Sequence, residues 1–316
     1  MARGGARLAG LNHQHGVIVV VLAGGTGGAK LARGLLDVGD DLVVIANTAD
    51  DVEAYGVHVA PDPDLVTYWL ADLIDERGYG LRGDSWKVME ALEDAGAPTW
   101  FRLGDRDLAM CLLRTELLRG GTRLTDAHAA VVRALGVSAR VLPMSDEPVR
   151  TWVRHGGRVM PFQEYMILER AAAPVEGVEL RGIEAARPSA DVLDAVAQAE
   201  LIVIGPSNPV ISIGPILGLA GMREALAAAS APVLAVSPFL GGRSIKGPTE
   251  QFCAWANIEA GAAGIARAYA GVLDAMVADE EVEGLPTLVT DTLLDTPERR
   301  RRLAESILEM GASLAA

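Results

Sequence analysis

Short, uninterrupted runs of Val, Ile and Leu recur along the chain and alternate with segments of helical periodicity. Five runs have the length of strands: residues 17–23, 42–46, 140–143, 201–205 and 233–237. Continuous apolar runs are typical of strands covered on both faces, as in a parallel sheet. Helical patterns occupy residues 65–76, 86–95, 107–119, 125–135, 190–199 and 221–229. The pattern therefore predicts an α/β fold: a Rossmann-like, mostly parallel sheet with helices on both faces and a largely helical insertion, roughly residues 65–200, in the middle third.

Composition narrows the classes of protein. We expect residues 17–316 to form a single α/β domain and residues 1–16 to be a disordered N-terminal extension, because that segment has no apolar signal region. No apolar run approaches the roughly 20 residues of a membrane span. The net charge of −14 argues against binding to nucleic acid, which needs a basic face. The two cysteines, Cys111 and Cys253, have no metal-site spacing and indicate a reducing compartment, so we expect a cytoplasmic protein.

A glycine-rich turn follows the first predicted strand: Gly24-Gly25-Thr26-Gly27-Gly28-Ala29-Lys30. A strand that continues through glycines into a helix directs backbone N–H groups and the positive helix end at one point, which favours a phosphate. The turn matches neither common nucleotide motif. The dinucleotide motif needs Gly in place of Lys30 and an acid in place of Asn47, and the mononucleotide loop needs Gly-Lys-Ser/Thr. We expect phosphate contact here; the alternative is a tight turn without a ligand.

Two further strand ends carry unusual polar groups. One is Asn47-Thr48-Ala49-Asp50-Asp51, and the other is Gly205-Pro206-Ser207-Asn208-Pro209, with Ser212 shortly after it. Ligands of parallel sheets bind at the carboxyl ends of the strands. We therefore expect both segments to lie beside the glycine turn. Ser207, Asn208, Pro209 and Ser212 then offer hydroxyl, amide and backbone groups for a second phosphate or a base edge.

Aspartates occur at two places near the predicted site. Asp50 and Asp51 follow the second strand, and two more lie within the stiff segment Pro61-Asp62-Pro63-Asp64. Carboxylates on rigid loops beside a phosphate site are common ligands of Mg²⁺. We expect Asp50, Asp51 and Asp64 to hold Mg²⁺ and Asp62 to be solvated; the alternative is that these acids cap helices. No Ser-His-Asp or Cys-His arrangement stands out among isolated histidines such as His58. The residues thus indicate an enzyme that uses metal and positioning without a covalent nucleophile.

The turn Leu103-Gly104-Asp105-Arg106-Asp107 concentrates charge before an apolar helix. Asp105 could cap a helix or line a pocket, and Arg102 beside it could pair with an anion or the polar edge of a ring.

In order and spacing these motifs resemble the 2-phospho-L-lactate transferase family over roughly residues 17–300. The similar segments are Gly24–Gly28, Asn47–Asp51, Pro61–Asp64, Leu103–Ala109, Leu142–Asp146, Phe162–Tyr165 and Pro206–Leu217. One departure is Asp62-Pro63-Asp64-Leu65, where family members often have Asp-Leu-Asp-Thr, so a threonine contact is missing.

The resemblance implies a step in the biosynthesis of coenzyme F-420. A phospholactyl or phosphoenolpyruvyl group moves from a guanosine-diphosphate-activated donor to the ribityl hydroxyl of the deazaflavin Fo, and GMP leaves in a Mg²⁺-dependent reaction. The resemblance implies that Asp50 lies at the metal and the acceptor hydroxyl, and that Asp64 and Arg102 contact Fo, as Asp105 beside Arg102 would. It places the Ser207 segment around GDP, and it implies a cytoplasmic homodimer.

Two other classes of protein compete with this interpretation. A related group shares the glycine turn and an Asn-Thr-x-Asp-Asp-like segment but binds nucleotide sugars as a regulator. We associate the Gly104–Asp107 turn and the Phe162–Tyr165 segment with the transferases, because both suit a large flat acceptor. An NAD dehydrogenase does not fit the glycine spacing or Asn47.

Overall fold

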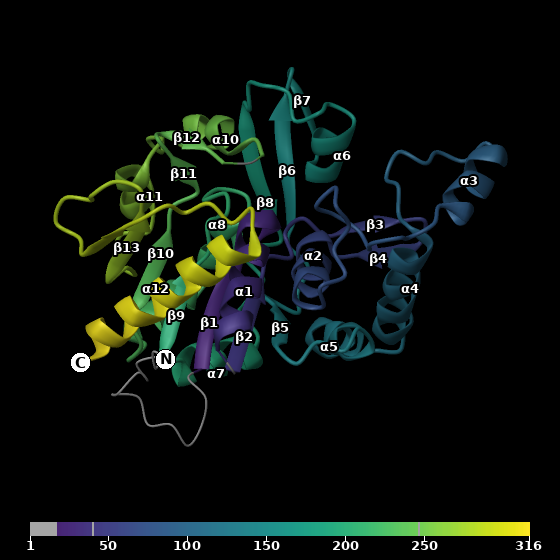
Figure 1. Cartoon of the computed structure of the whole chain (residues 1–316). Coiled ribbons are helices and arrows are strands. Elements are labelled where there is room, and N and C mark those ends of the chain that lie inside the picture. The colour runs from purple at the N-terminus through teal and green to yellow at the C-terminus, as the bar shows by residue number, and fades with distance from the viewer. Residues whose placement is uncertain (1–17, 40, 246) are drawn as a thin grey trace.

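Seven parallel strands form the central sheet of the computed structural model, which describes residues 18–39, 41–245 and 247–316 (Figure 1). Every neighbouring pair is parallel. The order across the sheet is β14 (Thr287–Val289), β13 (Ala275–Ala278), β10 (Val233–Val236), β9 (Leu201–Ile204), β1 (Ile18–Ala23), β2 (Asp41–Ala46) and β5 (Arg140–Pro143). The five strands predicted from the sequence are all present, whereas β13 and β14 were not predicted.

Helices cover both faces of this sheet. One face packs against α1 (Gly25–Val38), α2 (Pro61–Leu70), α5 (Leu124–Ala134) and α12 (Pro297–Ala315). The other face packs against α7 (Ala190–Gln198), α8 (Ile213–Gly218), α9 (Met222–Ala228) and α11 (Ala262–Ala268). Successive strand residues point to opposite faces, so Val19 and Val21 enter the first core and Val20 and Leu22 the second. The predicted α/β architecture, with helices on both faces, is confirmed.

The middle third adds helices and two small sheets to the end of the central sheet where its strands terminate (Figure 1). The hairpin β3 (Val52–Ala54) and β4 (Val57–Val59) packs with α4 (Asp105–Arg119), and α3 (Lys87–Asp94) lies beyond them. A three-stranded antiparallel sheet, not predicted from the sequence, follows in the order β7 (Arg158–Pro161), β6 (Arg150–His155), β8 (Gly177–Arg181). Helices α6 (Phe162–Ile167) and α10 (Thr249–Trp255) pack against it through Phe162 and Phe252, beside the short pair β11 (Phe239–Leu240) and β12 (Arg243–Ser244).

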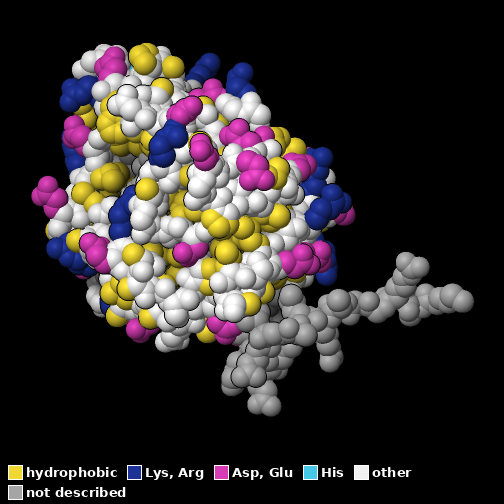
Figure 2. Space-filling model, turned by 90° about the vertical axis from the view of Figure 1, so that its left-hand side faces the viewer, with side chains coloured by type: hydrophobic (Ala, Val, Ile, Leu, Met, Phe, Trp, Pro, Cys, Tyr) yellow, Lys and Arg dark blue, Asp and Glu magenta, His cyan; other side chains and the backbone are white. Residues whose placement is uncertain are grey.

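The predicted extension at residues 1–16 lies outside the described residues. Within the described ranges, no helix has both the length and the hydrophobicity that crossing a membrane requires. Figure 2 shows the face that lies to the left in Figure 1, where hydrophobic side chains alternate with interspersed acidic and basic ones. That face carries no broad basic surface of the kind that nucleic acid needs.

Candidate functional site

Hydrogen bonds join the three polar strand ends that the sequence singled out. The Gly24 N–H donates to Ser207 Oγ over 3.4 Å, which links the end of β1 to the segment after β9. The Asn47 amide after β2 donates to the carbonyl of Ile211 over 3.2 Å. The expectation that these segments meet at one edge of the sheet is therefore confirmed.

The glycine turn is required by close packing. A Cβ at Gly27 would lie 2.0 Å from the carbonyl oxygen of Pro206, and one at Gly28 would lie 2.9 Å from Ser207 Oγ. Gly25 has φ +66, a left-handed conformation that glycine adopts without strain. These glycines let the start of α1 approach the loop after β9 more closely than any other residue would allow.

Asp62 accepts a hydrogen bond from the second residue of that turn. Its Oδ1 accepts a hydrogen bond from Gly25 N–H at 2.7 Å, and its Oδ2 accepts one from the Asn47 amide at 2.9 Å. The expectation that Asp62 is solvated was wrong, because only 6% of the residue is exposed. Burial, with a contribution from the charge of Asp51, raises the pKa of Asp62 to about 6 despite these two hydrogen bonds.

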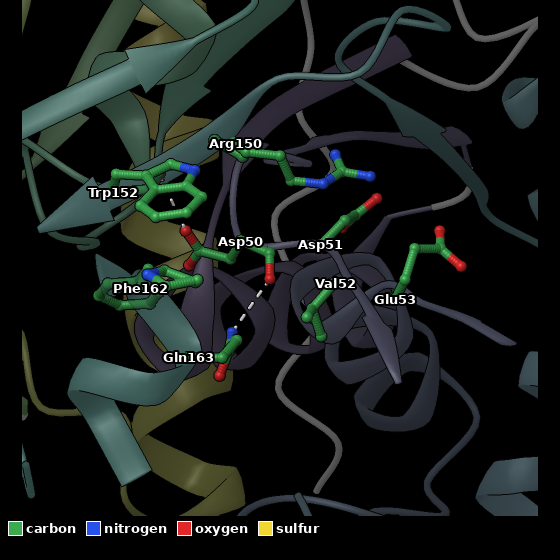
Figure 3. Close-up of a pocket in the computed structure, with 11 residues that line it drawn as sticks. Asp50, Asp51, Val52, Glu53, Arg150, Trp152, Phe162 and Gln163 are labelled. Carbon is green, nitrogen blue, oxygen red and sulfur yellow. Dashed lines mark hydrogen bonds between the residues drawn. The ribbon is translucent and has the colours of Figure 1, made fainter. Parts of the chain in front are cut away.

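Asp50 projects into a pocket at the carboxyl end of β2. The pocket has a volume of about 170 Å³, and Figure 3 shows the Asp50 carboxylate lying between the rings of Trp152 and Phe162. Its Oδ1 accepts a hydrogen bond from Thr151 Oγ1 at 3.4 Å, and its backbone carbonyl accepts one from Gln163 Nε2 at 3.1 Å. Burial raises the pKa of Asp50 well above its ordinary value, and the nearby charges of Asp62 and Asp51 raise it further. We name this cavity the Asp50 pocket; its walls are Ala49, Asp50, Asp51, Val52, Glu53, Arg150, Thr151, Trp152, Pro161, Phe162 and Gln163.

Asp51 is the second carboxylate of this pocket and is bonded on one side only. Its Oδ2 lies 2.9 Å from His58 Nε2, whereas its buried Oδ1 has no hydrogen-bond partner among the described residues. Burial raises the pKa of Asp51 in spite of the contact with His58. An unpartnered buried carboxylate oxygen beside a second buried carboxylate is the donor chemistry that a hard divalent cation prefers.

His58 links Asp51 to the surface, a role that the sequence analysis did not assign. Its Nδ1 lies 2.9 Å from the exposed Glu53 Oε1. Burial by itself lowers the pKa of His58, but its hydrogen bond to Asp51 and the Asp51 charge outweigh burial, so the pKa is raised. A sequence signal was available: alternating residues flank a two-residue turn at Tyr55 and Gly56, and this hairpin pairs Glu53 with His58.

Asp64 lies in a different environment from the other predicted metal ligands. Both its oxygens accept hydrogen bonds from the fully buried Arg114, each at 2.7 Å, and these bonds tie α2 to α4. His128 lies at 3.9 Å on the same carboxylate. Burial lowers the pKa of His128 to about 4, so it is neutral near neutral pH. The sequence analysis did not single out Arg114.

Asp105 and Arg102 lie on the lobe that carries α3. The Asp105 carboxylate accepts hydrogen bonds from Ser85 Oγ at 2.6 Å and from the Val88 N–H at 3.0 Å, so it caps α3. The half-exposed Arg102 lies over the ring of Trp86, 5.5 Å from its centre. On α1, Lys30 Nζ lies 5.6 Å from the centre of the Trp69 ring. The predicted contacts of these residues with Fo or phosphate stay predictions.

Comparison with known proteins agrees with the resemblance in the sequence. A family model described as "2-phospho-L-lactate transferase CofD" matches residues 19–292. The chain belongs to this family. It is 37% identical over 303 residues to the 2-phospho-L-lactate transferase of Methanosarcina mazei, covering 92% of this chain and 99% of that one. It is 42% identical over 260 residues to the phosphoenolpyruvate transferase of Kitasatospora aureofaciens, covering 79% of this chain and 81% of that one.

Among solved structures, a protein from Bacillus halodurans has a similar fold. The TM-score is 0.61 at 18% sequence identity, and the match covers 92% of this chain and 99% of the other. At this identity the likeness concerns the fold alone.

Proposed function

We propose that this chain transfers a phospholactyl or phosphoenolpyruvyl group from a guanosine-diphosphate-activated donor to the ribityl hydroxyl of the deazaflavin Fo, releasing GMP in coenzyme F-420 biosynthesis. Membership of the family supports the reaction class. The observation that carries the proposal is the pair of buried aspartates, Asp50 and Asp51, which both line the Asp50 pocket at the carboxyl end of β2. The comparisons do not support the regulatory alternative.

Mg²⁺ fits the donor set at Asp50 and Asp51. Asp51 Oδ1 is buried without a partner in the described part of the chain. Burial raises the pKa of Asp50, and the charges of the neighbouring carboxylates raise it further. A divalent cation relieves both costs, and when bound it would neutralise charge that develops on the transferred phosphate and the leaving GMP. We assign Asp50 and Asp51 to the metal. Asp64 instead has both oxygens on Arg114, so we give it the role of fixing α2 against α4.

The segment after β9 is suited to hold the diphosphate. Asn208 Oδ1 accepts hydrogen bonds from the N–H groups of Val210 and Ile211, which fixes the side chain. Its Nδ2 is buried and has no acceptor in the ranges that the structure describes, so it is a ready donor for a phosphate oxygen. Ser207 and Ser212, the backbone at Pro209, the Gly24–Gly28 turn with Thr26, and Lys30 complete the proposed donor site.

The walls of the Asp50 pocket suit the acceptor. Trp152 and Phe162 flank the Asp50 carboxylate with ring surfaces, which exclude water and can pack against a flat deazaflavin (Figure 3). Phosphoryl transfer depends mainly on positioning and neutralisation of charge, so a carboxylate between two rings is well placed to orient the attacking hydroxyl. The Asp50 carboxylate is also our candidate to accept the proton of that hydroxyl, because it projects into the pocket and burial raises its pKa, which makes it a stronger base than an ordinary carboxylate.

A fluorescence titration of the purified protein with Fo, with and without GDP and Mg²⁺, tests the proposal. We expect saturable binding that tightens when GDP and Mg²⁺ are present, and mass spectrometry of the reaction product then identifies the three-carbon group. Absence of Fo binding under every condition, together with binding of a nucleotide sugar, would overturn the proposal in favour of the regulatory alternative. Light scattering on the same sample tests the predicted homodimer.

A further inference from the structure

A second cavity lies against the Asp50 pocket and has no role in the function described so far. Its volume is about 230 Å³, and it shares Arg150 and Glu53 with the Asp50 pocket. We name it the Thr48 pocket, because Thr48 after β2 forms part of its wall beside His58.

The acidic side chains of this cavity already have partners. Glu53 contacts His58, Asp146 Oδ1 accepts hydrogen bonds from the N–H and Oγ1 of Thr125 at 2.8 Å each, and Glu147 accepts one from Ser145 Oγ at 2.7 Å. These carboxylates are therefore fixed by the protein and need no ligand cation.

Arg150, in contrast, has donors to spare. Its NH1 donates to the carbonyl of Val149 at 2.8 Å, and no carboxylate of the described chain lies within ion-pair distance of its guanidinium. The side chain reaches from the start of β6 over the Asp51 side of the Asp50 pocket (Figure 3). A half-buried guanidinium presents a planar fork of N–H donors that matches a carboxylate.

Thr48, in the wall of the same cavity, has a hydrogen-bonding group without a partner in the described chain. The residue is 1% exposed, and its Oγ1 has no hydrogen-bond partner among residues 18–39, 41–245 and 247–316. A buried hydroxyl without a partner costs free energy that a bound acceptor would recover.

We propose that Arg150 and Thr48 bind the carboxylate of the donor's three-carbon group in the Thr48 pocket. The inference rests on the proposed function. In both three-carbon groups the carboxylate is attached to the carbon that bears the phosphate oxygen, so it must lie close to the reacting phosphorus and hence to Asp50 and Asp51. The proposed Mg²⁺ offsets the charge of the two aspartates, and the donor's carboxylate brings a further negative charge beside them. Arg150 lines both cavities and supplies a positive charge for that carboxylate.

The proposal also explains how the same pocket can bind donors that carry either of the two three-carbon groups. Arg150 and Thr48 contact the feature that phospholactyl and phosphoenolpyruvyl groups share, the carboxylate. The two groups differ at the other two carbons, each of which carries one hydrogen fewer in the phosphoenolpyruvyl group.

The test combines a change in the protein with a change in the substrate. The donors are lactyl-diphosphoguanosine and its ethyl analogue, in which hydrogen replaces the carboxylate. We expect the wild type to lose about 30-fold or more in kcat/KM on the ethyl donor, and Arg150→Gln to lose about as much on the lactyl donor. Arg150→Gln should then use both donors at rates within about threefold of each other, because the carboxylate has lost its partner. Thr48→Val should lose about threefold to tenfold on the lactyl donor alone.

Arg154→Gln is the matched control on the same strand. Arg154 is half-exposed, lies 3.7 Å from Glu179 and lines neither cavity, so both donors should behave as with the wild type. Affinity for GDP and for Fo reports whether each variant is folded, because neither ligand carries the carboxylate. If Arg150→Gln keeps the wild-type preference for the lactyl donor, the inference is overturned while the proposed function stands. A wild type that transfers from neither the lactyl donor nor the phosphoenolpyruvyl donor overturns the proposed function and the inference with it.

Discussion

A group of three buried aspartates and a fourth buried aspartate lie close together in this chain but have opposite electrostatic surroundings. Asp50, Asp51 and Asp62 gather at the edge of the sheet, where burial raises the pKa of each and where His58 is the nearest basic partner. Asp64 is equally buried, yet both its oxygens are bonded to Arg114. All four aspartates are buried, but within the described residues only Asp64 has an arginine that bonds both of its oxygens.

The difference separates residues that stabilise the fold from residues kept for a ligand. A buried carboxylate bonded by a bidentate arginine is satisfied inside the protein, and losing one partner leaves an uncompensated charge. Carboxylates that crowd together without a cation reduce the free energy of unfolding unless something binds to them. We therefore interpret the Asp64–Arg114 pair as structural and the group of Asp50, Asp51 and Asp62 as functional.

The largest effect should follow from breaking the balanced pair. Arg114→Met leaves Asp64 buried without a partner and should lower the free energy of unfolding by about 3–5 kcal/mol. Urea unfolding followed by circular dichroism measures this change. The double variant Asp64→Leu/Arg114→Met should recover most of the loss, because an apolar pair replaces both charges. A double variant no more stable than Arg114→Met would contradict the structural interpretation.

The same double variant tests the role that the sequence predicted for Asp64. If the folded double variant transfers the three-carbon group at a rate near that of the wild type, Asp64 holds neither metal nor Fo. Loss of transfer in a folded double variant would restore Asp64 to the metal site.

Asp50→Asn should have the next largest effect. In contrast to Arg114→Met, it should lower activity and leave stability intact. Removing one carboxylate from the unbalanced group should lower turnover at least ~100-fold because a ligand of the proposed Mg²⁺ is lost. The melting temperature should stay unchanged or rise, since repulsion from Asp62 and Asp51 disappears. Steady-state turnover and calorimetry on one preparation check both parts, and turnover near that of the wild type would remove Asp50 from the mechanism.

A smaller effect should appear in the pH dependence of stability. Consider an acid whose pKa is higher in the folded state than in the unfolded state. Its protonated form stabilises the fold at pH values below its ordinary pKa, and this contribution is lost as the pH rises through the folded-state pKa. For Asp62 that window lies between its ordinary value and about 6. Mg²⁺ should replace the lost protons, so millimolar Mg²⁺ should raise the melting temperature by about 3 °C or more near pH 8 and by less than about 1 °C near pH 5.

Comparing samples with and without Mg²⁺ at each pH cancels groups outside the site. His128, for example, has a pKa lowered to about 4 by burial and acts in the opposite direction, but it contributes equally to both samples. Equal shifts at both pH values would indicate that the carboxylates with raised pKa do not bind the cation.

The fold was largely predictable because its strands are continuous apolar runs. The five predicted strands are present, and the predicted helices other than the one at 65–76 agree with the structure to within two residues at each end. The helix predicted at 65–76 instead spans Pro61–Leu70, since proline favours the first turn and Asp72 has φ +55. The small sheet was missed because β6 alternates buried residues with partly buried or exposed ones and therefore contains no continuous apolar run.

The site was predictable only as far as its residues lie in contiguous motifs. The meeting of the strand ends follows from the rule for parallel sheets, so the sequence placed Asp50, Asp51 and Ser207 at the same edge of the sheet. Arg114 and Arg150 reach the aspartates from distant segments, and no local spacing marks them, whereas His58 belongs to the hairpin next to Asp51. Asp62 was misjudged because its burial depends on Gly25 and Asn47, which approach it only in the folded chain.

The smallest expected effect contrasts Arg114 with an exposed arginine of the same lobe. Arg102 lies over Trp86 with its side chain 48% exposed, so Arg102→Ala should change the free energy of unfolding by less than about 1 kcal/mol. If Arg102 contacts Fo, as the family resemblance implies, the variant should weaken Fo binding by a few-fold and leave GDP binding unchanged. Titrations with Fo and with GDP measure the two affinities separately. Equal loss of affinity for Fo and for GDP would mean that the acceptor site is misplaced. No loss of either affinity would make Arg102 an ordinary surface residue. Arg114 would then differ from it because Arg114 is buried and bonded to a carboxylate.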